Sequence, residues 1–183
     1  MGWLWTHKPR GMTATEYLIH HSGALRWSDG PCDYKVLDSA VVNLRTFYAA
    51  VEQVERTTGE RRVWAAVFLL GYAPKSEHNF GYKDMDESCG PCEAACPERI
   101  LDLLTPTEYA HAIDWRARCR AKIAERKARP KIKPGMTLKL YGKPYTVGPA
   151  RGKSGFYLHD PASNIYQASH ARLRAATDIK EPA

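Results

Sequence analysis

Three long segments rich in apolar and β-branched residues dominate the first half of the chain and predict strands. They cover residues 34–44, 46–54 and 62–72, and small and polar residues at 57–60 predict a turn between the last two. Residues 63–70 are apolar without alternation, which is typical of a central strand covered on both faces. We therefore expect an antiparallel β-meander packed with helices.

Capping patterns predict where the helices begin. Thr13 and Glu16 have the spacing of a capping box, and a second box at 105–108 places Pro106 at the first helical position. The expected helices cover residues 14–21, 97–104 and about 105–127. The bulky residues Trp3 and Trp5 are expected to anchor a short first strand ahead of these helices.

Helical spacing gives the long helix an apolar side and a basic side. The apolar side would hold Tyr109, Ala112, Ile113, Cys119 and Ile123, and Arg118, Lys122 and Arg129 would point the opposite way. Arg116 and Arg120 fall near the apolar side, where a guanidinium group needs a carboxylate partner. The expected partners are Asp84, Asp86 and Glu87.

The last quarter of the chain has short strands separated by glycine turns. The expected strands are 136–141, 144–147, 155–159 and 164–168. Their number and length are those of a small SH3-like β-barrel. The predicted organisation is an α+β domain at 1–128, a linker at 129–134, the barrel at 135–176 and a tail at 177–183.

Positive charge is concentrated around the long helix and the linker. The chain has a net charge of +7, and residues 111–140 hold ten Lys and Arg residues against Asp114 and Glu125. Such a block predicts a polyanion partner or an acidic protein surface. The alternative is a solvated helix face followed by a charged linker.

The sequence also indicates the cellular compartment of the protein. No apolar run approaches the roughly 20 residues that span a bilayer, and no basic region followed by an apolar one opens the chain. We therefore expect a cytoplasmic protein without a membrane partner. An odd number of cysteines, five, argues against a disulfide framework and for thiols that are buried, reactive or metal-bound.

Three of these cysteines, Cys89, Cys92 and Cys96, have C-x2-C-x3-C spacing ahead of a predicted helix. They could bind zinc with a fourth ligand from Cys32, His78 or Cys119. The sequence CGPC at 89–92 also occurs at thioredoxin-like active sites, but here it follows a polar segment instead of a buried strand. The favoured interpretation is that small buried residues pack this loop onto the sheet.

Catalytic signatures are weak elsewhere. The chain has no P-loop, no G-x-G-x-x-G after a strand and no G-x-S-x-G. His78 near Asp84 and Asp86 could form an acid–base site, but a single histidine beside acids is more often a surface residue. A non-catalytic protein without a cofactor is therefore expected.

Several short sequence segments resemble those of a family of small uncharacterised proteins found in bacteria, bacteriophages and plasmids. They include NFGYKDMDE at 79–87, ILDLLTPT at 100–107, WRARCR at 115–120 and KPRGMT at 8–13. The likeness extends over about residues 1–130. It implies a mobile genetic element as the setting and no particular activity.

The leading hypothesis is a nucleic-acid-associated accessory protein of a mobile genetic element. The expected phosphate contacts are Arg118, Lys122, Arg126, Lys127, Arg129, Lys131, Lys133, Lys139, Lys143, Arg151 and Lys153. Aromatic residues of the barrel, Tyr141, Tyr145 and Tyr157, could add stacking. The alternatives are an inhibitor or adaptor that binds a host defence complex, and a zinc-stabilised or thiol-redox protein.

Overall fold

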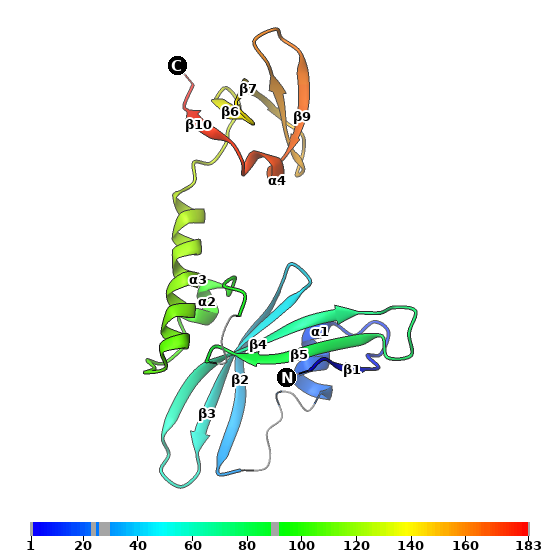
Figure 1. Cartoon of the computed structure of the whole chain (residues 1–183), viewed down its shortest axis with the longest axis vertical. Coiled ribbons are helices and arrows are strands. Elements are labelled where there is room, and N and C mark those ends of the chain that lie inside the picture. Colours follow the sequence, from blue (N-terminus) through cyan, green and yellow to red (C-terminus); the bar gives the residue numbers. More distant parts are fainter. Residues whose placement is uncertain (1, 23–24, 26–29, 89–91, 183) are drawn as a thin grey trace. The chain divides into compact units, whose positions relative to one another are not determined.

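The computed structural model describes residues 2–22, 25, 30–88 and 92–182. The chain forms two compact units, Met1–Lys127 and Ala128–Ala183. Each unit contains a five-stranded antiparallel sheet accompanied by helices, so the protein belongs to the α+β class, as predicted (Figure 1). None of the helices in the described ranges is long and apolar enough to cross a membrane.

The sheet of the first unit has the order β1-β5-β4-β3-β2. Its strands are β1 (Leu4–Thr6), β2 (Cys32–Val42), β3 (Thr46–Glu55), β4 (Arg61–Tyr72) and β5 (Phe80–Asp86). The predicted meander and the short first strand are confirmed. The sequence did not reveal β5, because Lys83, Asp84 and Asp86 give this strand the composition of a polar loop.

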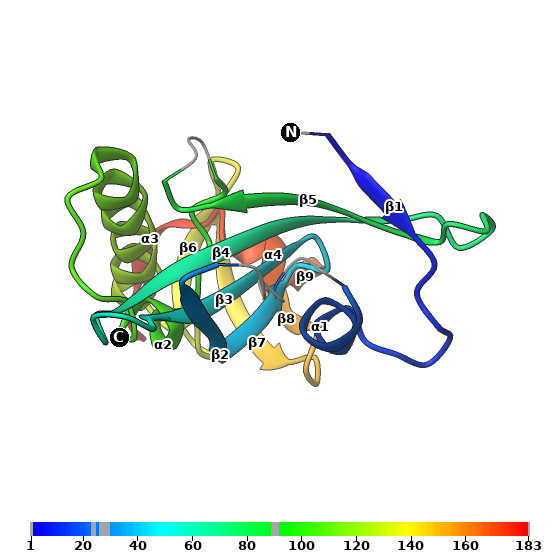
Figure 2. The same cartoon turned by 90° about the horizontal axis from the view of Figure 1, so that it is seen from below.

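Apolar cores cover both faces of this sheet, which confirms the prediction for its central strand. Alternation along β3 sends Tyr48 and Ala50 to one face and Phe47 and Val51 to the other. The helices α2 (Glu98–Leu101) and α3 (Ala110–Ala128) cover the first face. The opposite face packs on α1 (Ala14–Glu16) and the π-helical turn η1 (Tyr17–His21), as Figure 2 allows the reader to follow.

The two predicted capping boxes have different outcomes. At α1 the Thr13 hydroxyl accepts from the Glu16 amide, and the Glu16 carboxylate accepts from the Thr13 amide, so the first box is confirmed. The prediction of the second box is wrong. The Thr105 hydroxyl instead accepts a hydrogen bond from the Val63 amide on β4 and donates one to the Val63 carbonyl. The helix α3 therefore begins only at Ala110.

The buried side of α3 also differs from the predicted one. The side chains that it buries are Ala112, Trp115, Cys119 and Ile123. Tyr109 and Ile113, which were expected on this side, are 61% and 51% exposed. The late start of α3 explains part of the difference, because Tyr109 precedes the helix and is not held against the sheet.

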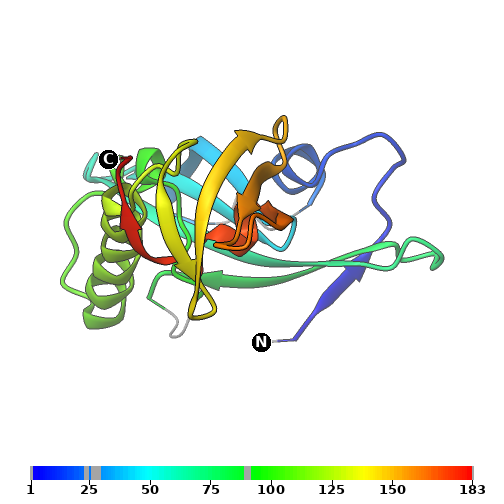
Figure 3. The ribbon, with the colours of Figure 1, turned by 90° about the horizontal axis from the view of Figure 1, so that it is seen from above.

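The sheet of the second unit has the order β10-β6-β7-β8-β9 (Figure 3). Its elements are β6 (Thr137–Leu140), β7 (Lys143–Ala150), β8 (Gly155–His159), β9 (Ile165–Ser169), α4 (His170–Leu173) and β10 (Thr177–Lys180). The core contains Met136, Leu138, Val147, Phe156 and Leu158. All four predicted strands are present.

The residues expected to form a tail contribute the fifth strand. Thr177 pairs with Lys139 and Lys180 pairs with Thr137, so β10 lies beside β6 (red and yellow in Figure 3). Among the described residues of this unit, the strand pairs do not join β9 to β10. Closure into an SH3-like barrel therefore stays a prediction.

Candidate nucleic-acid interface

The two units divide the charge of the chain unequally. Residues 128–183 contain ten Lys and Arg residues against three Asp and Glu residues, a net charge of +7. Residues 1–127 contain seventeen of each kind and are neutral overall. The basic block that was recognised at 111–140 crosses this boundary, and the whole net charge of the protein belongs to the second unit.

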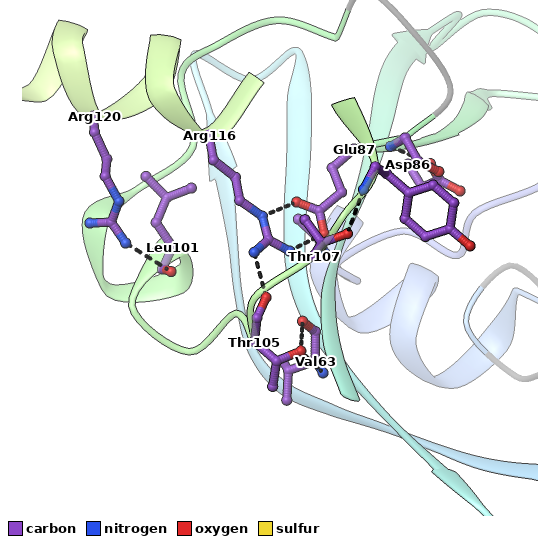
Figure 4. Close-up of polar contacts among 11 residues, drawn as sticks. Val63, Asp86, Glu87, Leu101, Thr105, Thr107, Arg116 and Arg120 are labelled. Atoms are coloured by element: carbon purple, nitrogen blue, oxygen red, sulfur yellow. Dashed lines mark hydrogen bonds and ion pairs between the residues drawn. The ribbon is translucent and has the colours of Figure 1, made fainter. Parts of the chain in front are cut away.

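Arg116, the first basic residue of α3 in the predicted block, forms an ion pair inside the first unit. Arg116 makes a two-point contact with the Glu87 carboxylate, with Nε–Oε2 and Nη2–Oε1 distances of 2.6 and 2.5 Å (Figure 4). It also donates to the Thr105 carbonyl at 2.5 Å, and Glu87, only 4% exposed, accepts from the Ala65 amide. This ion pair fastens α3 and the segment before it to the sheet, so Arg116 is not part of an outer binding surface.

Three other basic residues of α3 form ion pairs with nearby acidic residues. Arg120 contacts Asp102 at 3.0 Å and donates to the Leu101 carbonyl, the second contact visible in Figure 4. Arg118 pairs with Asp114, and Lys127 pairs with Glu98. The prediction that Glu87 would serve as a partner is confirmed, whereas Asp84 and Asp86 do not take that role for Arg120. Exposed pairs of this kind contribute about 0–1 kcal/mol each to stability, but they reduce the positive potential of the helix.

The outward stripe of α3 is consequently short. Lys122 and Arg126 lie one turn apart and are exposed, and within the described part of the chain neither forms an ion pair. Beyond them Arg129, Lys131 and Lys133 are exposed in the segment that leads to β6. The helix therefore has fewer unpaired positive charges on its outward side than the number of its basic residues suggested.

The remaining predicted contacts lie in the second unit. Lys139 pairs with Asp178 at 2.8 Å, and this carboxylate raises the pKa of Lys139. Lys143, Arg151 and Lys153 are exposed, and they form no ion pair with the described carboxylates of this unit. The prediction missed Arg172, Arg174 and Lys180, although counting charge separately for each unit would have found them.

A groove of about 410 Å³ lies on this unit, over the face of the sheet that points away from its core. Burial alternates along β6, where Leu138 and Leu140 are buried and Thr137 and Lys139 are exposed. The strand register aligns Thr137 with Thr146, and Thr146 with His159. The groove is lined by Thr137, Lys139, Pro144, Thr146, His159, Pro161, Asp178 and Lys180, among others.

The four described cysteines of the first unit are buried. They are Cys32, Cys92, Cys96 and Cys119, and Cys89 lies outside the described residues. Burial raises the pKa of the Cys96 and Cys119 thiols, which disfavours the thiolate that metal binding and nucleophilic attack require. Within the described ranges, no three His, Cys, Asp or Glu side chains are placed to hold a metal ion. The exposed His78 lies between β4 and β5.

A family described as a domain of unknown function, DUF6927, matches residues 106–143. This stretch covers α3, the segment after it and β6, which is less than half of the chain. No curated protein and no solved structure matches the chain. The match therefore supports only residues 106–130 of the resemblance expected over residues 1–130, and it assigns no activity.

Proposed function

We propose that the protein binds nucleic acid without catalysis, and that its second unit provides most of the contact with the phosphate backbone. The observation that carries this proposal is the charge division, +7 on residues 128–183 and zero on residues 1–127. A small unit with this much positive charge attracts a polyanion over distances of about a Debye length, ~10 Å at moderate salt.

The segment at 129–133 and the α3 residues Lys122 and Arg126 would extend the contact. Lys122 and Arg126 on the helix, and Lys131 and Lys133 in the segment, are exposed and form no ion pair within the described part of the chain. These four side chains can therefore meet phosphates without first losing an internal acid. Paired cations such as Arg118 and Lys127 would contribute less, because each must exchange an acid for a phosphate. Closure of the second sheet into an SH3-like barrel and a role as an accessory of a mobile genetic element belong to the same proposal.

Salt dependence of binding tests this function. The full chain is titrated against labelled single-stranded and duplex oligonucleotides by fluorescence anisotropy at several salt concentrations. Each phosphate contact should contribute about −0.9 on a duplex, or about −0.7 on a single strand, to the slope of log K against log salt. A steep slope is expected. Binding that is absent at low salt, or that does not change with salt, contradicts the proposal.

A protein-binding role is the second candidate, and exposed tryptophans favour it. Trp3 and Trp5 are 47% and 44% exposed, and their ring centroids lie 5.9 Å apart. Both lie against glycines: a Cβ added to Gly81 would be 2.8 Å from the Trp5 ring, and one added to Gly71 would be 3.0 Å from the Trp3 ring. Such an aromatic surface is typical of interaction sites.

Nuclease treatment separates the two candidates. For the protein-binding role, capture of a partner from host lysate should survive nuclease and be lost in a Trp3→Ala/Trp5→Ala variant. For the nucleic-acid role, nuclease should abolish capture, and the tryptophan variant should behave like the wild type.

A further inference from the structure

The groove on the second unit brings hydrogen-bond donors together in one row. Lys180 on β10 lies opposite Thr137 on β6, Thr137 lies opposite Thr146 on β7, and Thr146 lies opposite His159 on β8. Adjacent strands are about 4.8 Å apart, so four neighbouring strands place these four side chains along one line across the sheet. Two hydroxyls, an ammonium group and an imidazole therefore line the same groove.

These donors are not used within the fold. Among the described residues, the hydroxyls of Thr137 and Thr146 and the Lys180 ammonium group have no hydrogen-bond or ion-pair partner. An anion with several acceptor oxygens would satisfy them together. A phosphodiester has two unesterified oxygens and one negative charge, and it fits this set of donors.

One acidic group lies in the groove, and it is partly neutralised. Asp178 has a φ of 50° where the pairing of β10 with β6 is irregular, and its carboxylate contacts the Lys139 ammonium group at 2.8 Å. Lys139, and to a smaller extent Lys180, lower the pKa of Asp178, so the carboxylate is ionised at neutral pH. The charges of Lys139 and Asp178 cancel, which leaves Lys180 as the net charge available to an anion.

The size of the groove favours single-stranded nucleic acid over a duplex. A volume of about 410 Å³ is at the lower end of small-molecule sites and suits a single nucleotide unit. The rings of Pro144 and Pro161 line it beside the polar row, and they offer apolar contact to a sugar. A single strand can turn a phosphate together with its sugar into this recess, whereas a duplex holds its sugars in a stiff double helix.

We propose that this groove holds a phosphate and its sugar from a single-stranded nucleic acid. The inference rests on the proposed nucleic-acid binding and names the place and the form of the ligand. Thr137, Thr146 and His159 donate hydrogen bonds to the phosphate, and Lys180 supplies the positive charge. Gly148 leaves room for the imidazole, because a Cβ at this position would lie 2.6 Å from His159 Nε2.

Charge-neutral substitutions test the groove without changing the attraction of the whole unit. A Thr137→Val/Thr146→Val variant keeps the β-branched shape and the net charge but removes both hydroxyls. Its Kd for a labelled single strand should rise by at least about a hundredfold, since each of the two lost hydrogen bonds to a charged group is worth about 1.5–3 kcal/mol and every 1.4 kcal/mol is tenfold. The Thr137→Ser/Thr146→Ser variant retains the hydroxyls and should bind as the wild type does. Unchanged binding by the valine variant would overturn the proposal.

A second pair of variants keeps the test decisive if the valine variant does not fold. Asp178→Asn removes the acid of the groove, and asparagine tolerates the positive φ of this position. Glu181→Gln removes the same charge at an exposed residue that does not line the groove. The affinity of Asp178→Asn should rise severalfold and that of Glu181→Gln should change little. Equal gains would overturn the groove assignment.

Failure of this inference is distinguishable from failure of the proposed function. If the wild-type chain bound neither single-stranded nor duplex oligonucleotides, nucleic-acid binding itself would be wrong. If it bound with a steep salt slope but the two threonine variants were equivalent, only the groove assignment would be lost. Equal affinity for a duplex, with the same loss in the valine variant, would contradict the single-strand form of the ligand.

Discussion

At the scale of single residues, the ion pair of Arg116 with Glu87 differs most from its neighbours. Its side chains are 16% and 5% exposed, whereas those of Arg118 and Asp114 are 45% and 66% exposed. Removing one partner from a buried pair leaves an unsatisfied charge, so Arg116→Ala should lower the free energy of unfolding by about 3–5 kcal/mol. Arg118→Ala should cost less than about 1 kcal/mol. Urea unfolding of both variants checks this, and equal losses would contradict it.

Asp84 gives the protein a pH-dependent stability. Asp84 is exposed on β5, but neighbouring protein atoms still withdraw part of the solvation of its carboxyl group, and the Asp86 carboxylate repels its charge, so its pKa rises to about 6. Since the fold favours the protonated form, this contribution to stability is present at low pH and is lost as the pH rises from about 4 to about 6. Asp84→Asn should therefore stabilise the protein at neutral pH and not near pH 4, as thermal unfolding at both values would show. A pH-independent difference would contradict this account.

Thiol reactivity is the third prediction at this scale. In a Cys89→Ser background, the four remaining cysteines are the buried ones, and their thiols should react with a disulfide reagent only as fast as the protein unfolds. Rapid labelling in native buffer, or zinc that co-purifies with the wild-type chain at one equivalent, would instead support the metal or redox alternative.

At the scale of elements, the outer edge of the first sheet is blocked by a side chain. The strand β2 is the last in the order, and its pairing with β3 shifts between Val36 and Asp38. Arg99 contacts Asp38 and donates to the Ser39 carbonyl at 2.9 Å, which occupies a backbone acceptor of this edge. Edge strands with free backbone groups pair with other chains, and bulges and charged side chains prevent this.

Removing that side chain should expose the edge. Arg99→Ala is expected to increase the weight-average mass with concentration in sedimentation experiments. The control is Arg61→Ala, because Arg61 pairs with Glu52 between the inner strands β4 and β3 and does not protect an edge. If both variants sedimented like the wild type, Arg99 would have no protective role.

The sequence predicted those elements whose signal is local. The meander followed from segments rich in apolar and β-branched residues, and α1 followed from a capping box that acts within four residues. The start of α3 could not be predicted, because the Thr105 hydroxyl bonds Val63, a residue 42 positions away. The strand β10 was overlooked because Ile179 is the single apolar residue among its four, and its stability comes from pairing with β6.

At the scale of the whole molecule, the proposed function depends on where the boundary between the units falls in the sequence. The sequence identified the basic residues but joined those of α3 with those of the second unit in one block. The structure pairs several α3 cations with acids and leaves the second unit with the full net charge. The groove could not be predicted either, since all its lining residues except Pro161 come from four strands whose register is set by long-range pairing.

Comparing the salt dependence of two charge-matched variants tests the central claim most directly. Arg151→Glu/Lys153→Glu changes the second unit, and Lys122→Glu/Arg126→Glu changes α3 by the same total charge. The second-unit variant should show a weaker affinity and a flatter slope of log K against log salt than the α3 variant, because the proposal gives most of the phosphate contacts to the second unit. Equal slopes, or a larger loss in the α3 variant, would contradict the assignment of binding to the second unit.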